Sequence, residues 1–270
     1  MISINQVEYS YPRKTGLFND FSLTVETGSI LGLLGKNGAG KTTLLKLISG
    51  LLAPSKGKLD VNGFNPVERH PDFLASLFMV PEEFTLPPVT IDCYARAATP
   101  LYPLFDDTKL DNILKEFELK RSDHLSRVSH GQRKKFLIAF ALATNCHILL
   151  LDEPTNGLDI PSKSVFRKVL VSSISEEQLV IISTHQVKDI DTVIDNLLVI
   201  DEGKTVYHKD LSVIGQSLHF ETVTSIAGID QVLYSERCPL GYRIVTPSTD
   251  SQETAIDMEL LFNAIINKKI

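Results

Sequence analysis

The hydrophobic and polar positions of the chain predict an α/β protein with a mostly parallel sheet. Short, continuous apolar runs bounded by turn residues are typical of strands buried in such a sheet. These runs occupy 30–34, 77–80, 148–151 and 179–183. Residues 2–9 and 20–26 instead alternate between apolar and polar side chains, which indicates N-terminal antiparallel strands with one exposed face.

An inserted helical subdomain is expected between two of these strands, at about 84–143. From Leu110 to Phe117 the apolar side chains recur at the i, i+3, i+4, i+7 spacing of an amphipathic helix. The stretch 133–143, which contains an apolar run with interspersed alanines, predicts a second, mostly buried helix, for which Ser129 is a suitable N-cap. The period of the pattern therefore changes from that of strands to that of helices.

The pattern changes again after a hairpin predicted at 196–207. We expect a main domain at 1–214 and a small C-terminal α+β accessory domain at 215–270. The strands expected in the accessory domain lie at 219–225 and 242–246. A capping box formed by Asp250 and Glu253 predicts a C-terminal helix. No group of residues in this domain indicates a chemical site.

Candidate chemistry begins with a glycine-rich stretch of the P-loop pattern G-x-x-x-x-G-K-[ST]. It follows the first apolar run, precedes a helix that includes Thr43, and reads Gly35-Lys36-Asn37-Gly38-Ala39-Gly40-Lys41-Thr42. Its glycines let successive N–H groups converge on a phosphate, and the following helix adds its positive N-terminal end. Lys41 is expected to reach the β- and γ-phosphates of a nucleotide, and Thr42 to hold a magnesium ion.

Acidic side chains are expected beside the P-loop, because the apolar run 148–151 ends in Asp152 and Glu153. The carboxyl ends of parallel strands lie at one edge of a sheet, where ligands bind. Asp152 is a candidate magnesium ligand, and Glu153 a candidate base that polarises the attacking water. His185 ends the next buried strand, where it can contact a γ-phosphate. Glu82, also at a strand end, either lies near the metal or is simply solvated.

Composition narrows the classes of protein that fit. The 270 residues carry a formal net charge of −6 and no basic stripe, which argues against a nucleic-acid partner. The three cysteines are widely spaced without a C-x-x-C, which indicates reduced thiols in a cytoplasmic protein. With no signal peptide and no run of about 18 apolar residues, any membrane spans are expected to belong to another polypeptide.

Further short motifs accompany the P-loop and the acidic strand. They are Ser129-His130-Gly131-Gln132, Leu158-Asp159 and His185. In their order and spacing, the motifs of residues 1 to about 210 resemble those of nucleotide-binding subunits of the ATP-binding cassette family. The resemblance implies a P-loop NTPase core that forms a head-to-tail dimer with a second copy or a paralogue. Each ATP would lie between the P-loop of one subunit and the signature, residues 129–132, of the other.

The resemblance also implies roles for single residues within one subunit. Tyr11, which local sequence alone would assign to strand packing, corresponds to the aromatic residue that stacks on adenine. Lys41, Glu153 and His185 correspond to the catalytic set, as phosphate ligand, general base and γ-phosphate sensor. The usual loop glutamine near magnesium is replaced by Glu82, and our hypothesis is that Glu82 keeps the magnesium-side coupling role.

Other residues are implied to act across the dimer. Ser129 and Gly131 would contact the γ-phosphate of the opposite site, next to Gln132, and Asp159 would help to couple the two sites. His130 replaces the usual glycine of the signature. It is either tolerated variation or a pH switch that places a positive charge near the γ-phosphate, and tolerated variation is the preferred interpretation.

The leading functional interpretation is an ATPase that binds ATP and Mg²⁺ and powers a membrane transporter from the cytoplasmic face of the cell membrane. Its partners would be integral-membrane subunits, and the short insertion and small C-terminal domain favour a bacterial exporter. One alternative is a soluble ATPase of the same family that acts on DNA or ribosomes, which the single cassette and acidic balance disfavour. Another is a cassette with little turnover, which intact Lys41, Asp152 and Glu153 disfavour.

Overall fold

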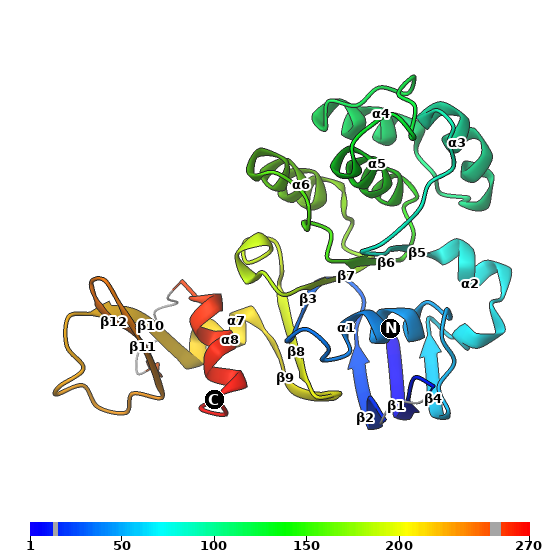
Figure 1. The fold of residues 1–270 in the computed structure, drawn as a ribbon. Helices are drawn as coiled ribbons and strands as arrows, with labels where there is room; N and C mark the ends of the chain where they lie inside the picture. Colours follow the sequence, from blue (N-terminus) through cyan, green and yellow to red (C-terminus); the bar gives the residue numbers. More distant parts are fainter. Residues whose placement is uncertain (13–15, 249–254) are drawn as a thin grey trace.

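The protein, described here by a computed structural model over residues 1–12, 16–248 and 255–270, is built around a six-stranded sheet (Figure 1). In spatial order its strands are β5 (Leu77–Val80), β6 (Ile148–Asp152), β7 (Leu179–Thr184), β3 (Ser29–Leu34), β8 (Asn196–Asp201) and β9 (Lys204–Asp210). Neighbouring strands are parallel, except that β8 and β9 form the antiparallel hairpin expected from the sequence. The expected mostly parallel α/β sheet is thus confirmed.

Both faces of this sheet are buried, which explains why its strands read as continuous apolar runs. Along β6, Ile148 joins one hydrophobic cluster and the next residue, Leu149, joins the other. The first cluster is shared with α1 (Lys41–Ile48), and the second with α5 (His130–Ala143) and α6 (Ile160–Ser173). The central sheet is therefore fixed from both sides, and its strand ends present side chains from a rigid support.

A second, antiparallel sheet confirms the expected N-terminal strands. Its order is β2 (Phe18–Val25), β1 (Ile2–Tyr9) and β4 (Lys56–Val61). The strand β2 begins two residues earlier than the sequence pattern indicated. The chain continues through η1 (Pro66–Glu68) and α2 (Pro71–Ser76) into β5. This sheet packs against the same cluster as α1, so it holds the helix that follows the P-loop.

The helical insertion is confirmed, and Figure 1 shows it as a layer of helices beyond the β5 and β6 end of the sheet. It contains α3 (Ile91–Ala98), η2 (Thr99–Leu101), α4 (Asp107–Glu116) and α5, and α5 is capped by Ser129 as expected. From Phe136 to Ala143, α5 is completely buried, so one helix connects the signature to the core. No helix within the described ranges is long and apolar enough to cross a membrane.

The C-terminal part forms its own small antiparallel sheet. The elements are α7 (Leu211–Ser217), β10 (Leu218–Val223), β11 (Tyr234–Cys238), β12 (Gly241–Pro247) and α8 (Met258–Ile266), with the strands in the order β10-β12-β11. The two expected strands are confirmed. The sequence pattern did not indicate α7 or β11, because the polar sequence of β11 carries no apolar alternation.

The start of α8 differs from the sequence expectation. Asp250 and Glu253, the expected capping box, lie outside the described residues. Asp257 is the N-cap of α8, and its Oδ1 accepts a hydrogen bond from Leu260 N at 3.0 Å. Buried side chains of α8 belong to the same hydrophobic cluster as those of β8, so the core continues across the boundary at 214–215. That boundary stays a prediction.

Candidate functional site

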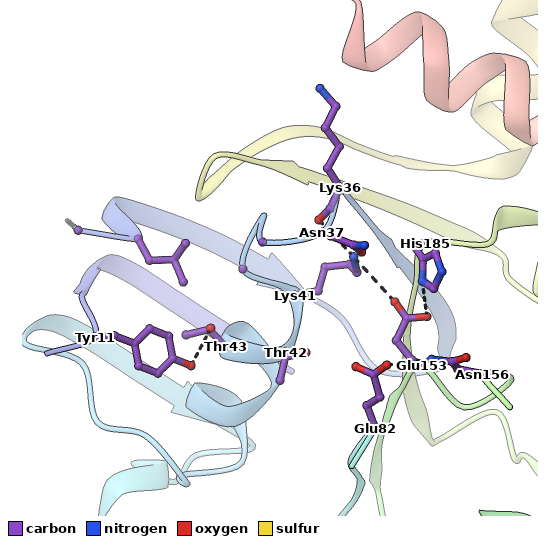
Figure 2. Close-up of a pocket in the computed structure, with 14 residues that line it drawn as sticks. Tyr11, Lys36, Asn37, Lys41, Thr42, Thr43, Glu82, Glu153, Asn156 and His185 are labelled. Atoms are coloured by element: carbon purple, nitrogen blue, oxygen red, sulfur yellow. Dashed lines mark hydrogen bonds and ion pairs between the residues drawn. The ribbon is translucent and has the colours of Figure 1, made fainter. Parts of the chain in front are cut away.

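A cavity of about 670 Å³ opens where the carboxyl ends of β3, β6 and β7 meet the loop before β2. Figure 2 shows Tyr11 and Thr43 at one end of this cavity, and Glu82, Glu153 and His185 at the other. The lining residues that the sequence predicted are Tyr11, Lys36, Asn37, Gly38, Gly40, Lys41, Thr42, Thr43, Glu82, Glu153 and His185. The other three predicted residues are not among those that line the cavity. Gly35 and Ala39 lie in the P-loop, and Asp152 is the last residue of β6. One cavity thus collects most of the predicted contacts of a single subunit.

The P-loop connects β3 to α1 through left-handed backbone that glycine adopts readily. Gly38 has a φ of 82°, and Gly40, the N-cap of α1, has a φ of 111°. A Cβ atom on Gly40 would also lie 2.9 Å from the ring of Phe18. Lys41 Nζ donates a hydrogen bond to Gly35 O at 2.7 Å. The loop therefore holds its own lysine over the position expected for phosphates, while the Lys36 side chain points away from it (Figure 2).

Glu153 carries the carboxylate at the centre of the site (Figure 2). Its Oε2 lies 2.9 Å from His185 Nδ1, and its Oε1 lies 3.9 Å from Lys41 Nζ. Burial lowers the pKa of Lys41, and the nearby carboxylates of Glu153, Asp152 and Glu82 counteract that shift. A buried carboxylate between an ammonium group and an imidazole, at the mouth of a phosphate loop, is well placed to accept a proton from water.

Asp152 ends β6 in a position that suits a metal site. Its Oδ1 accepts a hydrogen bond from Ser183 Oγ at 2.5 Å, whereas its buried Oδ2 has no partner among the described residues. Such an oxygen is costly to leave unpaired, so a water molecule or a cation fits beside it. Magnesium ions in nucleotide sites use only one or two protein ligands besides water and phosphate. With Thr42 on the cavity wall, the residues present fit this donor set.

The two neighbouring tyrosines have different environments. Tyr9 is buried in the N-terminal sheet, and burial, with a contribution from Tyr11, raises its pKa. Tyr11 lies on the cavity wall, where its hydroxyl is 3.1 Å from Thr43 Oγ1 and its ring meets that of Tyr9 edge-on at 5.1 Å. Strand packing is therefore the role of Tyr9, and Tyr11 is positioned for contact with a bound molecule.

Among the described residues, those that line this cavity do not include the signature, residues 129–132. Ser129 and Gln132 form a capping box: Ser129 Oγ accepts from Gln132 N at 3.1 Å, and Gln132 Oε1 accepts from Ser129 N at 2.9 Å. Asp159 caps α6 by accepting from Ser162 N at 2.9 Å, and hydrogen bonds from Ser162 lower the pKa of Asp159. A single subunit thus does not bring Ser129 or Asp159 to its own P-loop.

Three residues near the site were missed in the sequence. The Asn156 Nδ2 group donates to Glu82 Oε1 at 2.9 Å, and the ring of Phe84 stacks on His130 with a centroid separation of 5.3 Å. Lys134, although charged, is buried. Of the three, only the burial of Lys134 had a signal in the sequence. Helical spacing places Lys134 on the same face as the apolar residues three and four positions later.

Comparison with known proteins identifies the relatives of the chain. The family model described as "ABC transporter" matches residues 18–156. The ABC transporter ATP-binding protein NatA of Bacillus subtilis (strain 168) is 32% identical over 216 residues, which cover 77% of this chain and 87% of the relative. The Nod factor export ATP-binding protein I of Burkholderia orbicola (strain AU 1054) is 33% identical over 219 residues, which cover 76% and 69%.

Solved structures show the same fold. An ATP-binding subunit of an ABC transporter matches with a TM-score of 0.70 and 23% identity, over 79% of this chain and 91% of that chain. A dimeric ATP-binding cassette bound to ADP and Pi matches with a TM-score of 0.67 and 21% identity, over 78% and 99%. The resemblance inferred from the motifs is thereby confirmed. The chain belongs to the ABC transporter family, as an ATP-binding subunit that hydrolyses ATP for transport.

Proposed function

We propose that this subunit works as half of a head-to-tail ATP dimer that drives an export system, with Glu153 as the general base. The observation that carries this proposal is the position of Glu153 between Lys41 and His185 in the P-loop cavity, while Ser129 lies outside that cavity. A cavity that contains the base but not the signature is half of a catalytic site. The missing half must come from a second subunit.

Within one subunit, the described residues divide the work of phosphoryl transfer. The P-loop amides and Lys41 bind the phosphates, and Tyr11 provides an aromatic face for the adenine. Glu153 accepts the proton of the attacking water, and His185 holds the Glu153 carboxylate and contacts the γ-phosphate. A magnesium ion held by Thr42 and Asp152, with Glu82 nearby, would neutralise the charge that develops on the phosphate oxygens.

The general-base role is tested by comparing ATP hydrolysis of the wild type with that of Glu153→Gln. The amide keeps the size of the side chain but cannot accept the proton, so we expect turnover to fall by roughly 100-fold or more with ATP affinity retained. Unchanged turnover in Glu153→Gln would remove Glu153 from this role.

The head-to-tail arrangement is tested at the signature. ATPases of this family dimerise. We expect Ser129→Arg to bind ATP as the wild type does, because Ser129 lies outside the cavity of its own subunit. The same variant should fail to dimerise in ATP, since the new side chain would occupy the space for the γ-phosphate of the partner. Analytical ultracentrifugation measures this, and an ATP-dependent dimer of Ser129→Arg would contradict the arrangement.

The membrane partner and the direction of transport form the last part of the proposal. Members of the family pair with membrane transporter subunits, and the relatives include a Nod factor export protein and a lantibiotic transport protein. We place this subunit on the cytoplasmic face of the membrane, bound to multi-span subunits of an exporter. Affinity purification from detergent extracts should recover such subunits, and recovery of ribosomes or DNA instead would favour the non-transport alternative.

A further inference from the structure

Lys134 of α5 is a buried lysine whose hydrogen bonds go to the catalytic loop. The residue is 1% exposed, and its Nζ donates to Glu153 O at 2.8 Å and to Asn156 O at 3.1 Å. Burying an ammonium group is costly unless its donors are satisfied. Here two backbone carbonyls accept hydrogen bonds from the ammonium group, which reduces the cost of burying it. One of these carbonyls belongs to Glu153, the proposed general base.

The backbone at Glu153 needs such support. Its φ is 46°, a left-handed conformation that is strained for a residue with a side chain. Ser183 of β7 fixes one side of it, because the Glu153 N–H group donates to Ser183 O and to Ser183 Oγ, each at 3.1 Å. On the other side, the Glu153 carbonyl accepts from Lys134. The strained residue is thus held from the sheet and from α5.

The electrostatics of Lys134 agree with this geometry. Burial lowers the pKa of Lys134, and the carboxylates of Glu82, Glu153 and Asp152 raise it in turn. The ammonium group therefore lies within the field of the acidic groups that surround the nucleotide site. An apolar side chain at this position would pack without a desolvation cost, so packing alone does not account for a lysine.

The same helix also carries the signature. Ser129 caps α5, and Gly131 lies so close to the loop after Glu153 that a Cβ atom on it would be 3.2 Å from Gly157 O. The first turn of α5 and Lys134 in its second turn therefore contact one loop. Any shift of α5 that accompanies contact with a second subunit reaches Glu153 through the Lys134 hydrogen bonds.

We propose that Lys134 is a positioning residue for ATP hydrolysis, which fixes the backbone of Glu153 and transmits the position of the signature helix to the carboxylate of the same subunit. This inference rests on the proposed role of Glu153 as general base. Lys134 touches neither the nucleotide nor the attacking water in this assignment. It acts by keeping the Glu153 carboxylate aligned between Lys41 and His185.

The test compares Lys134→Met with a matched control, Lys109→Met, in the full-length protein. Lys109 Nζ also donates to a backbone carbonyl, Ser173 O, and to Asn145 Oδ1, each at 2.6 Å, and burial also lowers its pKa. It lies in α4, away from the cavity. Both variants lose a partly or fully buried ammonium group, so a general loss of stability affects both.

We expect Lys134→Met to lower kcat by about tenfold or more, with KM and the affinity for a non-hydrolysable ATP analogue within about twofold of wild type. Amide hydrogen exchange of segment 152–158 should become faster in Lys134→Met. Lys109→Met should keep kcat within about twofold and leave exchange of this segment unchanged, whatever its melting temperature. If Lys134→Met does not fold, the same measurements are made on Lys134→Gln. The glutamine side chain keeps one donor group but is shorter and carries no charge.

An unchanged kcat in folded Lys134→Met overturns the proposal, and so does an equal loss of kcat in Lys109→Met. Unchanged exchange of segment 152–158 overturns it as well, because the hydrogen bonds would then not hold the loop. Failure of the general-base role is distinguishable from these outcomes. It appears as unchanged turnover in Glu153→Gln, a variant that leaves Lys134 intact.

Discussion

His185 Nδ1 lies 2.9 Å from Glu153 Oε2, so the strand ends of β7 and β6 bring an imidazole and a carboxylate into direct contact. The two side chains come from neighbouring parallel strands, in which Asp152 pairs with Ser183. Glu153 therefore lies one residue, and His185 two residues, beyond this last pair, at the same edge of the sheet. Their contact is therefore set by the sheet and does not depend on the position of a mobile loop.

The first expectation concerns this contact. His185→Ala removes the partner of Glu153 and the residue expected at the γ-phosphate. We expect kcat for ATP hydrolysis to fall by roughly 100-fold, with nucleotide affinity nearly unchanged because the P-loop is intact. Steady-state kinetics and binding of a fluorescent ATP analogue measure the two effects separately. Weaker binding with normal kcat would instead make His185 a simple binding residue.

Glu82 gives the second expectation. Its carboxylate accepts a hydrogen bond from Asn156 and lies on the cavity wall. If it supports magnesium, Glu82→Ala should raise the magnesium concentration needed for half-maximal ATPase activity by about tenfold. Glu82→Gln is the matched variant, because its amide oxygen can still accept from Asn156 but carries no charge.

The two variants at Glu82 separate the charge from the hydrogen bond. A shift of equal size in both shows that the negative charge supports the metal. A shift in Glu82→Ala alone shows that an uncharged side-chain oxygen is enough at this position, as a metal-side group or as the acceptor of the hydrogen bond from Asn156. Magnesium dependence that is the same in all three proteins would contradict the hypothesis that Glu82 has a magnesium-side role.

The positions of candidate site residues can be predicted from the sequence where strand ends determine them. The apolar runs locate β3, β6 and β7, and a parallel sheet brings their carboxyl ends to one edge, so Asp152, Glu153 and His185 follow from the pattern. The Tyr11 side chain lies on the cavity wall, although local sequence suited packing equally well. Its neighbour Tyr9 fills the packing role, a division that depends on burial in the folded sheet.

Sequence reasoning failed where a contact joins elements distant in the chain. The hydrogen bonds of Lys134 to Glu153 O and of Asn156 to Glu82 depend on how α5, β6 and the loop after β5 pack together. Helical spacing can indicate that Lys134 is buried, but it does not identify the groups that such residues contact. Local signals can also be ambiguous, because Asp257 caps α8 although an acidic pair at 250 and 253 suggested an earlier start.

The third expectation concerns His130, whose ring stacks on Phe84 with an interplanar angle of 24°. A ring stacked at the first residue of α5 has a structural role that does not require protonation. An aromatic pair of this kind contributes about 0.5 to 1.5 kcal/mol, so His130→Gly should lower stability slightly. ATPase rates of wild type and His130→Gly should follow parallel pH profiles between about pH 5.5 and pH 8.5. Profiles that diverge on the acidic side would establish the pH switch instead.

The fourth expectation concerns Cys146, which is buried before β6. Burial raises the pKa of its thiol from 9.0 to about 11. The folded protein therefore keeps a proton at pH values where the unfolded chain has lost it. The buried thiol therefore contributes its full stabilisation of the folded protein below about pH 9. As the pH rises toward 11 this stabilisation is lost, and the free energy of unfolding falls by up to about 3 kcal/mol. Urea unfolding of wild type and Cys146→Ala from about pH 8 to about pH 11 measures this loss.

The comparison with Cys146→Ala is necessary because other groups titrate in the same range. Burial lowers the pKa of Lys41, Lys109 and Lys134, so the unfolded chain binds more protons at these lysines than the folded protein does. Their contribution makes stability rise with pH up to about 10.5, opposite in sign to that of Cys146. The difference between the two proteins isolates the thiol. Equal slopes in wild type and Cys146→Ala would contradict the raised pKa of the Cys146 thiol.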